Sequence, residues 1–176
     1  MGRRGRRYGD VKKMRWTLPT ILAGFALAVA ACSPQAATPA PAPQQAAPAK
    51  HPISGLDVIP LTISQNGNTH SFRVEVARTN AEQEKGLMFR TSMGKDEGML
   101  FPSPYPEARS FWMKNTVIPL DIVFIGADHR IGNIAANAVP YSEDPIPSAG
   151  ETIAVLELNG GRAAELGFTP GARVTW

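Results

Sequence analysis

Residues 59–76 read IPLTISQNGNTHSFRVEV and contain the clearest structural signal in the chain. Apolar and polar residues alternate on both sides of the central Asn66-Gly67 pair. A period of two places successive side chains on opposite faces of a strand, and Asn-Gly is a preferred two-residue turn between antiparallel strands. The stretch therefore predicts a β-hairpin.

The chain beyond the hairpin consists of short apolar segments separated by turn residues. Thr79 with Glu82 fits the capping box of a short helix that Gly86 ends, and a second helix fits residues 161–166. Further strands are expected at residues 98–101, 109–114, 121–125, 130–135 and 152–158, with a loop over 139–150 and a last strand ending at Trp176. About eight strands and two brief helices predict a mainly-β fold, a compact antiparallel sandwich or barrel-like domain over residues 53–176.

The first 31 residues have the pattern of a secretory signal peptide. Arg15 precedes an uncharged run over residues 16–31, which is shorter than the roughly 20 apolar residues that a membrane span needs. Met14 is an alternative start, because the segment from there has more usual signal-peptide proportions. The run ends in Val29-Ala30-Ala31-Cys32, which resembles the bacterial lipobox, where a cysteine receives diacylglycerol. The alternative is an ordinary signal cut nearby that leaves Cys32 as a free thiol.

Cys32 is the single cysteine of the chain, so no internal disulfide can form. The lipobox resemblance implies an exported protein whose partner is a lipid bilayer, held through acylated Cys32 and facing the periplasm or the outside. Ser33 in place of aspartate favours the outer membrane. The rest of the segment 32–52 holds six prolines and seven alanines, a composition that cannot bury enough apolar surface to fold, and it predicts an extended tether.

Charge is unevenly distributed along the chain. Seven of the 18 basic residues but one of the 15 acidic residues precede Cys32, so the remainder carries 11 basic and 14 acidic residues. The basic character of the whole chain therefore belongs to the signal segment. Nucleic-acid binding requires a basic face on the folded domain, so we expect no nucleic-acid partner.

Several kinds of chemistry lack their sequence marks. The chain contains neither a phosphate-binding Gly-rich loop nor a Gly-x-Ser-x-Gly elbow. His51, His70 and His129 are far apart in sequence, whereas a zinc site usually needs three or four ligands. We therefore expect no metal and no cofactor, and we expect a monomer.

Five dense patches mix apolar and polar residues: GLMFR at 86–90, GMLF at 98–101, SFWMKNT at 110–116, PLDIVF at 119–124 and LELNGG at 156–161. Their order and spacing closely resemble the domain-of-unknown-function family 192 over about residues 56–176. FWMKNT followed by PLD is the most specific part of the match. The resemblance implies a mainly-β, sandwich-like fold and no assigned activity.

The SFWMKNT patch supplies the first candidate binding residues. If residues 109–114 form a strand, Trp112 and Lys114 point to the same face. An indole beside an ammonium group suits a sugar ring or a small anion. The alternative is that Trp112 belongs to the core and Lys114 extends past it to water.

Four polar residues complete the candidate site, and each has a structural alternative. Arg90 could clamp a carboxylate or phosphate, or form an internal ion pair with an acid such as Asp121 or Glu157. Glu157 interrupts an apolar strand, so it needs a cationic partner or a wet pocket. Asp121 and Asn115 are either site residues or side chains that fix turns.

Three functional hypotheses follow. The first is a non-catalytic binding module for a small polar or anionic ligand, such as a glycan fragment, whose pocket is lined by Arg90, Trp112, Lys114, Asn115, Asp121 and Glu157. The second is an enzyme that acts on envelope glycans with Asp121 and Glu157 as acid and base, which requires the two carboxyls within about 5–10 Å. The third is Cu(I) binding by the thioethers of Met88, Met99 and Met113, although methionines beside apolar residues usually fill core gaps.

Overall fold

The computed structural model describes residues 49–176. The predicted signal peptide, Cys32 and most of the predicted tether lie outside the described residues. The tether prediction extended to residue 52, but the structure begins a strand at Ala49. This strand pairs with the chain at Asp57 and Val58, so the last residues before the domain are part of its sheet.

A single eight-stranded sheet dominates the described residues, and two short helices accompany it. The strands are β1 (Ala49–Lys50), β2 (Asp57–Gln65), β3 (Asn68–Val76), β4 (Glu97–Phe111), β5 (Leu120–Ile125), β6 (Ile131–Ala138), β7 (Ile146–Asn159) and β8 (Arg173–Thr175). The helices are α1 (Asn80–Lys85) and α2 (Arg162–Glu165). This confirms the predicted mainly-β class with two short helices.

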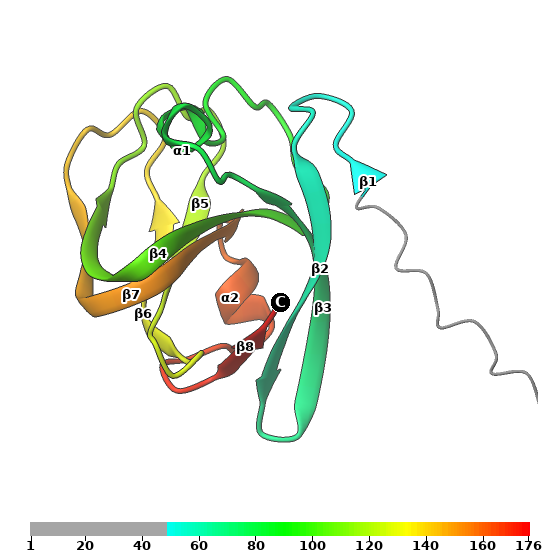
Figure 1. Ribbon diagram of the computed structural model, residues 1–176, viewed down its shortest axis with the longest axis vertical. Helices are drawn as coiled ribbons and strands as arrows, with labels where there is room; N and C mark the ends of the chain where they lie inside the picture. The colour runs from blue at the N-terminus through cyan, green and yellow to red at the C-terminus, as the bar shows by residue number, and fades with distance from the viewer. Residues whose placement is uncertain (1–48) are drawn as a thin grey trace, which may run out of the picture. The chain divides into compact units, whose positions relative to one another are not determined.

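The strand order is β1-β2-β3-β4-β7-β5-β6, and β8 pairs with β2 outside this path. Every pairing is antiparallel except that of β3 with β4, which is parallel, so the sheet is mixed rather than wholly antiparallel. The exception arises because α1 and the following loop carry the chain back alongside β3, so that Glu97 at the start of β4 pairs with Arg73. In Figure 1, β4 and β7 curve between the β2–β3 hairpin and β5–β6, and α2 lies within this curve.

The predicted hairpin is confirmed in its register and in its turn. Gln65 pairs with Asn68, which leaves Asn66 and Gly67 as the two turn residues. Both turn residues have positive φ, 51° and 81°, as the type I′ turn requires.

The predicted capping box of α1 is also confirmed. The Thr79 hydroxyl accepts a hydrogen bond from the Glu82 backbone N–H at 3.3 Å, and the Glu82 carboxylate accepts one from the Thr79 N–H at 2.8 Å. The backbone hydrogen bonds from Thr79 and Arg78 lower the pKa of Glu82. The cap fixes where α1 begins, and α1 in turn forms one wall of the cavity described below.

The middle of the chain differs from the prediction. One long strand, β4, replaces the separate strands expected at 98–101 and 109–114, and it ends at Phe111. The pairing of β4 with β7 shifts between Pro102 and Glu107 and again between Ala108 and Ser110. Prolines remove strand hydrogen bonds and are accommodated at such irregularities, so the proline-rich middle bends the strand without ending it.

Alternating residues of β5 and β7 contribute to two hydrophobic cores. Val123 and Leu156 belong to one core together with residues of the hairpin and α2. Ile122 and Val155 belong to the other, together with Met99, Phe101 and Met113. Since neighbouring residues of a strand point to opposite faces, the two cores lie on opposite sides of these strands. The candidate site borders the second core.

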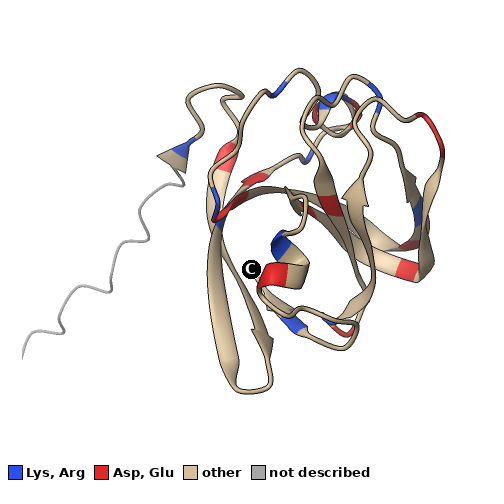
Figure 2. Ribbon diagram, turned by 180° about the vertical axis from the view of Figure 1, so that it is seen from behind, with Lys and Arg blue, Asp and Glu red and all other residues tan. Residues whose placement is uncertain are grey.

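Charged residues of both signs are interspersed along the ribbon (Figure 2). No helix within residues 49–176 is both long enough and apolar enough to span a membrane.

Candidate functional site

A cavity of about 360 Å³ lies between α1 and the last residues of β4. Its wall continues over residues 86–88 after the helix and over the loop that follows β4, and β7 contributes Glu157. Apolar lining comes from Leu87, Met88, Phe111 and Trp112. Charged lining comes from Glu84, Lys85, Arg109, Lys114 and Glu157.

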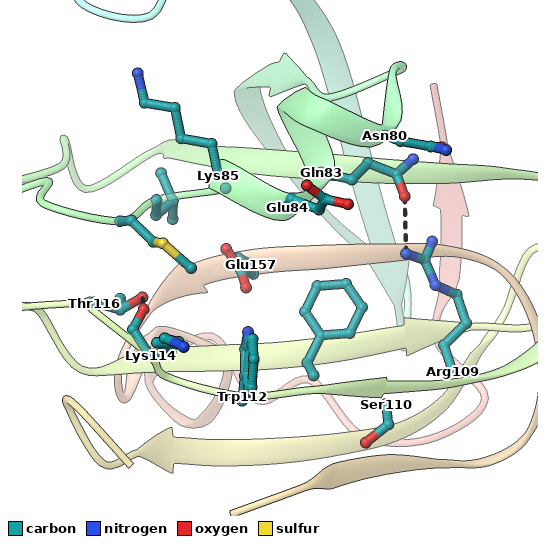
Figure 3. A pocket seen from close by; sticks show the side chains of 14 residues that line it. Asn80, Gln83, Glu84, Lys85, Arg109, Ser110, Trp112, Lys114, Thr116 and Glu157 are labelled. Carbon is teal, nitrogen blue, oxygen red and sulfur yellow. Dashed lines mark hydrogen bonds between the residues drawn. The ribbon is translucent and has the colours of Figure 1, made fainter. Parts of the chain in front are cut away.

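Glu157 is the most unusual residue of the cavity. Its neighbours across the sheet are Met99 on β4 and Ile122 on β5, both buried and apolar. Glu157 is 5% exposed, and within residues 49–176 its carboxyl group has no hydrogen-bond or ion-pair partner. Burial raises the pKa of Glu157 to about 8. In Figure 3 the carboxyl group points from β7 into the cavity, so solvent reaches this group through the cavity.

Trp112 and Lys114 form one wall of the same cavity. Trp112 is 48% exposed, and the Lys114 Nζ atom lies 5.0 Å from the centroid of the Trp112 ring. The two side chains lie together although β4 ends at Phe111, so strand alternation is not the cause. Instead, Met113 is fully buried and its backbone N–H donates to the Ser142 carbonyl at 2.8 Å, which leaves the residues on either side facing outward.

Arg109 fastens α1 to the cavity wall, a role that sequence reasoning did not assign. Its guanidinium donates to Gln83 Oε1 at 2.9 Å, to Ser103 Oγ at 3.0 Å and to the Phe101 carbonyl at 3.3 Å. The Gln83 amide donates in turn to the Pro102 carbonyl at 3.0 Å. Burial lowers the pKa of Arg109. In the sequence, the one feature that could have identified Arg109 as a site residue is its position just before SFWMKNT.

Arg90 is not free to bind a ligand. It forms a two-pronged ion pair with Glu75, at 2.9 Å to Oε1 and 3.0 Å to Oε2, and both residues are buried. Ser54 donates to the same carboxylate, and His51 Nδ1 lies 3.4 Å from it. An internal ion pair was one of the two predicted roles, but its acid is Glu75 rather than Asp121 or Glu157.

Asp121 is fully buried and holds three backbone segments together. Its carboxylate accepts hydrogen bonds from the backbone N–H groups of Asn137 at 2.8 Å, Gly161 at 2.9 Å and Ala163 at 2.7 Å. It therefore anchors the start of α2 and does not line the cavity.

The predicted acid–base pair of Asp121 and Glu157 is wrong. Asp121 pairs with Leu158 across the sheet, whereas Glu157 pairs with Ile122. Because neighbouring residues alternate, the two carboxyls face opposite sides of the sheet and cannot share a glycosidic bond.

Asn115 supports the loop after β4 rather than lining the cavity. It has positive φ of 53°, and its carbonyl accepts a hydrogen bond from the Phe89 N–H at 2.8 Å. Its side-chain amide donates weakly to Met88 Sδ at 3.8 Å. Of the six predicted site residues, the cavity thus brings together Trp112, Lys114 and Glu157 and leaves out Arg90, Asn115 and Asp121.

The three methionines have different surroundings. Met99 and Met113 are buried in the second core, while Met88 lines the cavity. Within the described part of the chain, no group of three or more His, Cys, Asp or Glu residues is placed to hold a metal ion.

A second hollow of about 550 Å³ shares Lys85, Gly86 and Met88 with the first cavity as lining residues. Its lining is mainly apolar and includes Ile53, Leu56 and Phe89. Arg90 also borders it, but that charge is already neutralised by Glu75. The Glu157 carboxyl group, which has no partner in residues 49–176, lines the first cavity, which we call the Glu157 cavity.

The fold and this cavity define a small mainly-β domain with one buried, unpartnered acid at a solvent-reachable hollow. The chain belongs to the DUF192 family, described as "Uncharacterized ACR, COG1430", whose model matches residues 61–176.

Two solved structures resemble this chain. A protein of unknown function from Novosphingobium aromaticivorans DSM 12444 is 60% identical, with a TM-score of 0.72 over 74% of this chain and 94% of that chain. A protein from Sinorhizobium meliloti 1021, described as a candidate transcription regulator, is 42% identical, with a TM-score of 0.65 over 66% of this chain and 91% of that chain. No curated protein matches.

Proposed function

We propose that the domain is a non-catalytic binding module whose Glu157 cavity takes a small polar ligand carrying an anionic group. The observation that carries this proposal is the Glu157 carboxyl group, which is buried without a partner and opens onto the cavity. A buried acid without a partner costs stability, and acids whose pKa values are strongly shifted in a cleft cluster at functional sites.

The charges around the cavity support an anionic ligand. Lys85, Arg109 and Lys114 line it, against Glu84 and Glu157. With a pKa of about 8, Glu157 is mostly uncharged at neutral pH, so the lining is then positive overall. Arg109 is committed to Gln83, and in Figure 3 the Lys85 side chain runs away from Glu157, which leaves Lys114 beside Trp112 to meet an anion.

The size and the aromatic wall support a ring-shaped ligand. Small-ligand sites commonly occupy about 300–1,000 Å³, and the Glu157 cavity falls at the lower end of this range. The half-exposed indole of Trp112 offers a flat face of the kind that sugar rings cover. A single sugar residue or a short glycan fragment fits these features.

Binding is favoured over catalysis because Asp121, the second acid of the predicted acid–base pair, does not share a face of the sheet with Glu157. Asp121, the proposed partner, accepts three backbone hydrogen bonds on the opposite face. Copper binding has no supporting observation, since Met99 and Met113 are packed in the core.

We also propose that the chain is an exported lipoprotein, anchored through Cys32 to a bacterial membrane, with the outer membrane favoured. The support is the sequence of residues 14–32, with a basic flank, a short apolar run and a lipobox-like end. Intact-mass analysis of the protein from native membranes tests this. Diacylglycerol on an N-terminal Cys32 is expected, whereas a free thiol in a longer chain contradicts the proposal.

The binding proposal is tested by calorimetric titration of the full chain, in detergent, with a panel of acidic and neutral monosaccharides. Trp112→Ala and Lys114→Ala should each weaken binding of any ligand that the wild type binds by about tenfold. Trp176→Ala is the matched control, because Trp176 is a partly exposed tryptophan that packs on His129 and does not line the cavity. Equal binding by the wild type and both cavity variants would overturn the proposal.

A further inference from the structure

We propose that the loops at one end of the domain rest on the bilayer that holds the Cys32 anchor, with their exposed apolar side chains in the interfacial region of the lipid. This inference rests on the proposed lipoprotein anchor and goes beyond it by naming the face that meets the membrane. It is argued from four loops, residues 51–56, 86–96, 112–119 and 139–145, which we call the apolar end.

The four loops lie together at one end of the domain. Figures 1 and 2 show them along the upper edge of the ribbon, opposite the turn between β2 and β3. The Phe89 N–H donates to the Asn115 carbonyl at 2.8 Å, and the Tyr141 N–H donates to the Thr116 carbonyl at 3.2 Å. Ile53 and Phe89 line the same hollow of about 550 Å³. The loops therefore form one continuous surface.

This surface carries most of the exposed large apolar side chains. Seven such side chains are exposed in residues 49–176, and five of them lie on the four loops: Ile53, Phe89, Trp112, Val139 and Tyr141. Gathered apolar exposure marks interaction sites, membranes among them, and aromatic residues favour the membrane–water interface. The composition of the apolar end fits a lipid surface.

The backbone at two of these residues gives an independent indication. Phe89 and Tyr141 both have φ of 64°, while every other non-glycine residue with positive φ in the described part of the chain is Asn or His. Asn and His adopt this conformation more readily than bulky residues do. Because both rings are also exposed, neither packing nor backbone geometry favours an aromatic residue there. Such a combination points to a function for the exposed rings.

The place where the chain enters the domain indicates which surface is within reach. Ala49 pairs with Val58 near the start of β2, so the entering strand leads directly into the loop 51–56 of the apolar end. Cys32 and Ala49 are 17 positions apart. An extended chain of that length spans at most about 60 Å. Such a tether holds the domain at a millimolar effective concentration near the bilayer, so a weak apolar contact suffices for docking.

Charge does not supply the attraction. Of the Lys, Arg, Asp and Glu residues on these loops, three have no ion-pair partner within residues 49–176: Lys114, Glu143 and Asp144. One cation against two acids gives no attraction to anionic lipid. Docking therefore depends on apolar contact, and we expect it to be independent of the anionic lipid content.

Quenching of tryptophan fluorescence by brominated acyl chains tests the orientation. The processed, lipidated protein would be reconstituted in phosphatidylethanolamine–phosphatidylglycerol vesicles, with Tyr141→Trp as reporter in a Trp112→Phe, Trp176→Phe background. Its fluorescence should fall by about half, because interfacial side chains lie about 5–10 Å into the headgroup and acyl boundary. Trp176, as the remaining tryptophan in Trp112→Phe, is the control. It follows β8, which pairs with the half of β2 nearest the hairpin turn, and should be little quenched.

A double variant tests whether the loops dock as one surface. Ile53→Ser with Phe89→Asn removes apolar side chains from two loops, and asparagine tolerates the positive φ at residue 89. Quenching of the Tyr141→Trp reporter should fall at least about twofold, since interfacial binding scales with the apolar area buried. Tyr105→Ser, which changes an exposed aromatic residue of β4 outside the four loops, is the matched control and should have no effect. Unchanged quenching in the double variant would contradict the proposal.

The remaining outcomes separate this inference from the anchor on which it rests. Intact-mass analysis first establishes whether the sample carries diacylglycerol on Cys32. Lipidated protein without quenching of Tyr141→Trp would overturn the inference and leave the anchor standing, whereas protein without lipid would overturn both. Quenching that disappears when phosphatidylglycerol is omitted would overturn the apolar basis of docking. Absence of quenching together with cross-linked dimers that Phe89→Asn abolishes would assign the apolar end to a second copy of the chain instead.

Discussion

The two faces of β5 and β7 each hold a buried acid, and the two acids differ in their hydrogen-bond partners. Asp121, on one face, accepts three backbone hydrogen bonds and fixes the start of α2. Glu157, on the other, has no partner in residues 49–176 and faces a cavity. Burial alone therefore does not distinguish a structural acid from a functional one, whereas an account of the hydrogen-bond partners does.

A third buried acid marks an intermediate case. Glu75 is as inaccessible as Glu157, but the guanidinium of Arg90 neutralises it and hydrogen-bonds both of its oxygens. Within residues 49–176 Glu157 has no such partner, and burial raises the pKa of its carboxyl group to about 8. This contrast among three acids yields predictions of decreasing size.

The largest effect is expected from Glu157 when the pH is varied. Its pKa is raised from 4.5 to about 8, so the folded protein retains a proton that the unfolded chain has already lost between these values. The free energy of unfolding should therefore be highest below pH 4.5 for this group and should fall as the pH rises to about 8, by roughly 5 kcal/mol in all. Glu157→Gln should lack this component. Urea unfolding at pH 5, 7 and 9 measures the difference, and parallel pH profiles for the two proteins would contradict it.

The next effect concerns Asp121. Asp121→Asn replaces one accepting oxygen by an NH₂ group that faces backbone donors, and it removes the negative charge that they stabilise. We expect a loss of about 3–4 kcal/mol in the free energy of unfolding at pH 7. Asp128→Asn is the matched control, since Asp128 is exposed and accepts one turn hydrogen bond. A loss for Asp121→Asn as small as that of Asp128→Asn would mean that the three contacts of Asp121 carry little energy.

Breaking the ion pair of Arg90 with Glu75 is also expected to lower the free energy of unfolding. Arg90→Met leaves the Glu75 carboxylate buried without its cation, which should destabilise the fold by about 3 kcal/mol. The double variant Arg90→Met with Glu75→Leu should recover most of this loss, because no charge then remains buried. Chemical denaturation of the three variants measures the coupling, and additive losses would show that the two residues do not act as a pair.

The smallest expected effect on stability is that of Trp112. Trp112→Ala should change the free energy of unfolding by less than about 1 kcal/mol, because the side chain is half exposed. Its neighbour Met113 is fully buried, so Met113→Ala should cost about 2–5 kcal/mol. A large loss for Trp112→Ala would assign Trp112 to the core and weaken its role as a ligand platform.

The elements that could be predicted from the sequence are those set by local rules. The Asn66-Gly67 hairpin and the Thr79–Glu82 cap depend on residues a few positions apart, and both form as expected. The parallel pairing of β3 with β4 and the continuous length of β4 depend on where α1 returns the chain and on how β7 follows the bent strand. No pattern in the sequence carries that information.

The candidate site shows the same division. The sequence identified Glu157 as an acid in an apolar strand that needs a partner or a pocket, and the structure places it at a cavity. Pairing Asp121 with Glu157 failed because the relative register of β5 and β7 decides which face each residue takes. The partner of Arg90 was not predicted because Glu75 occupies a polar position of the alternating hairpin pattern. An acid at such a position is expected to face solvent.

The measurement that tests the account most directly is the titration of the Glu157 carboxyl carbon by NMR. Carboxyl-labelled full-length protein would be titrated from pH 4 to pH 10, with Glu157→Gln identifying the resonance. A midpoint near pH 8 is predicted, because the group is buried without a partner. A midpoint near the ordinary glutamate value of about 4.3 would show that Glu157 is solvated or paired and would contradict the account of the cavity.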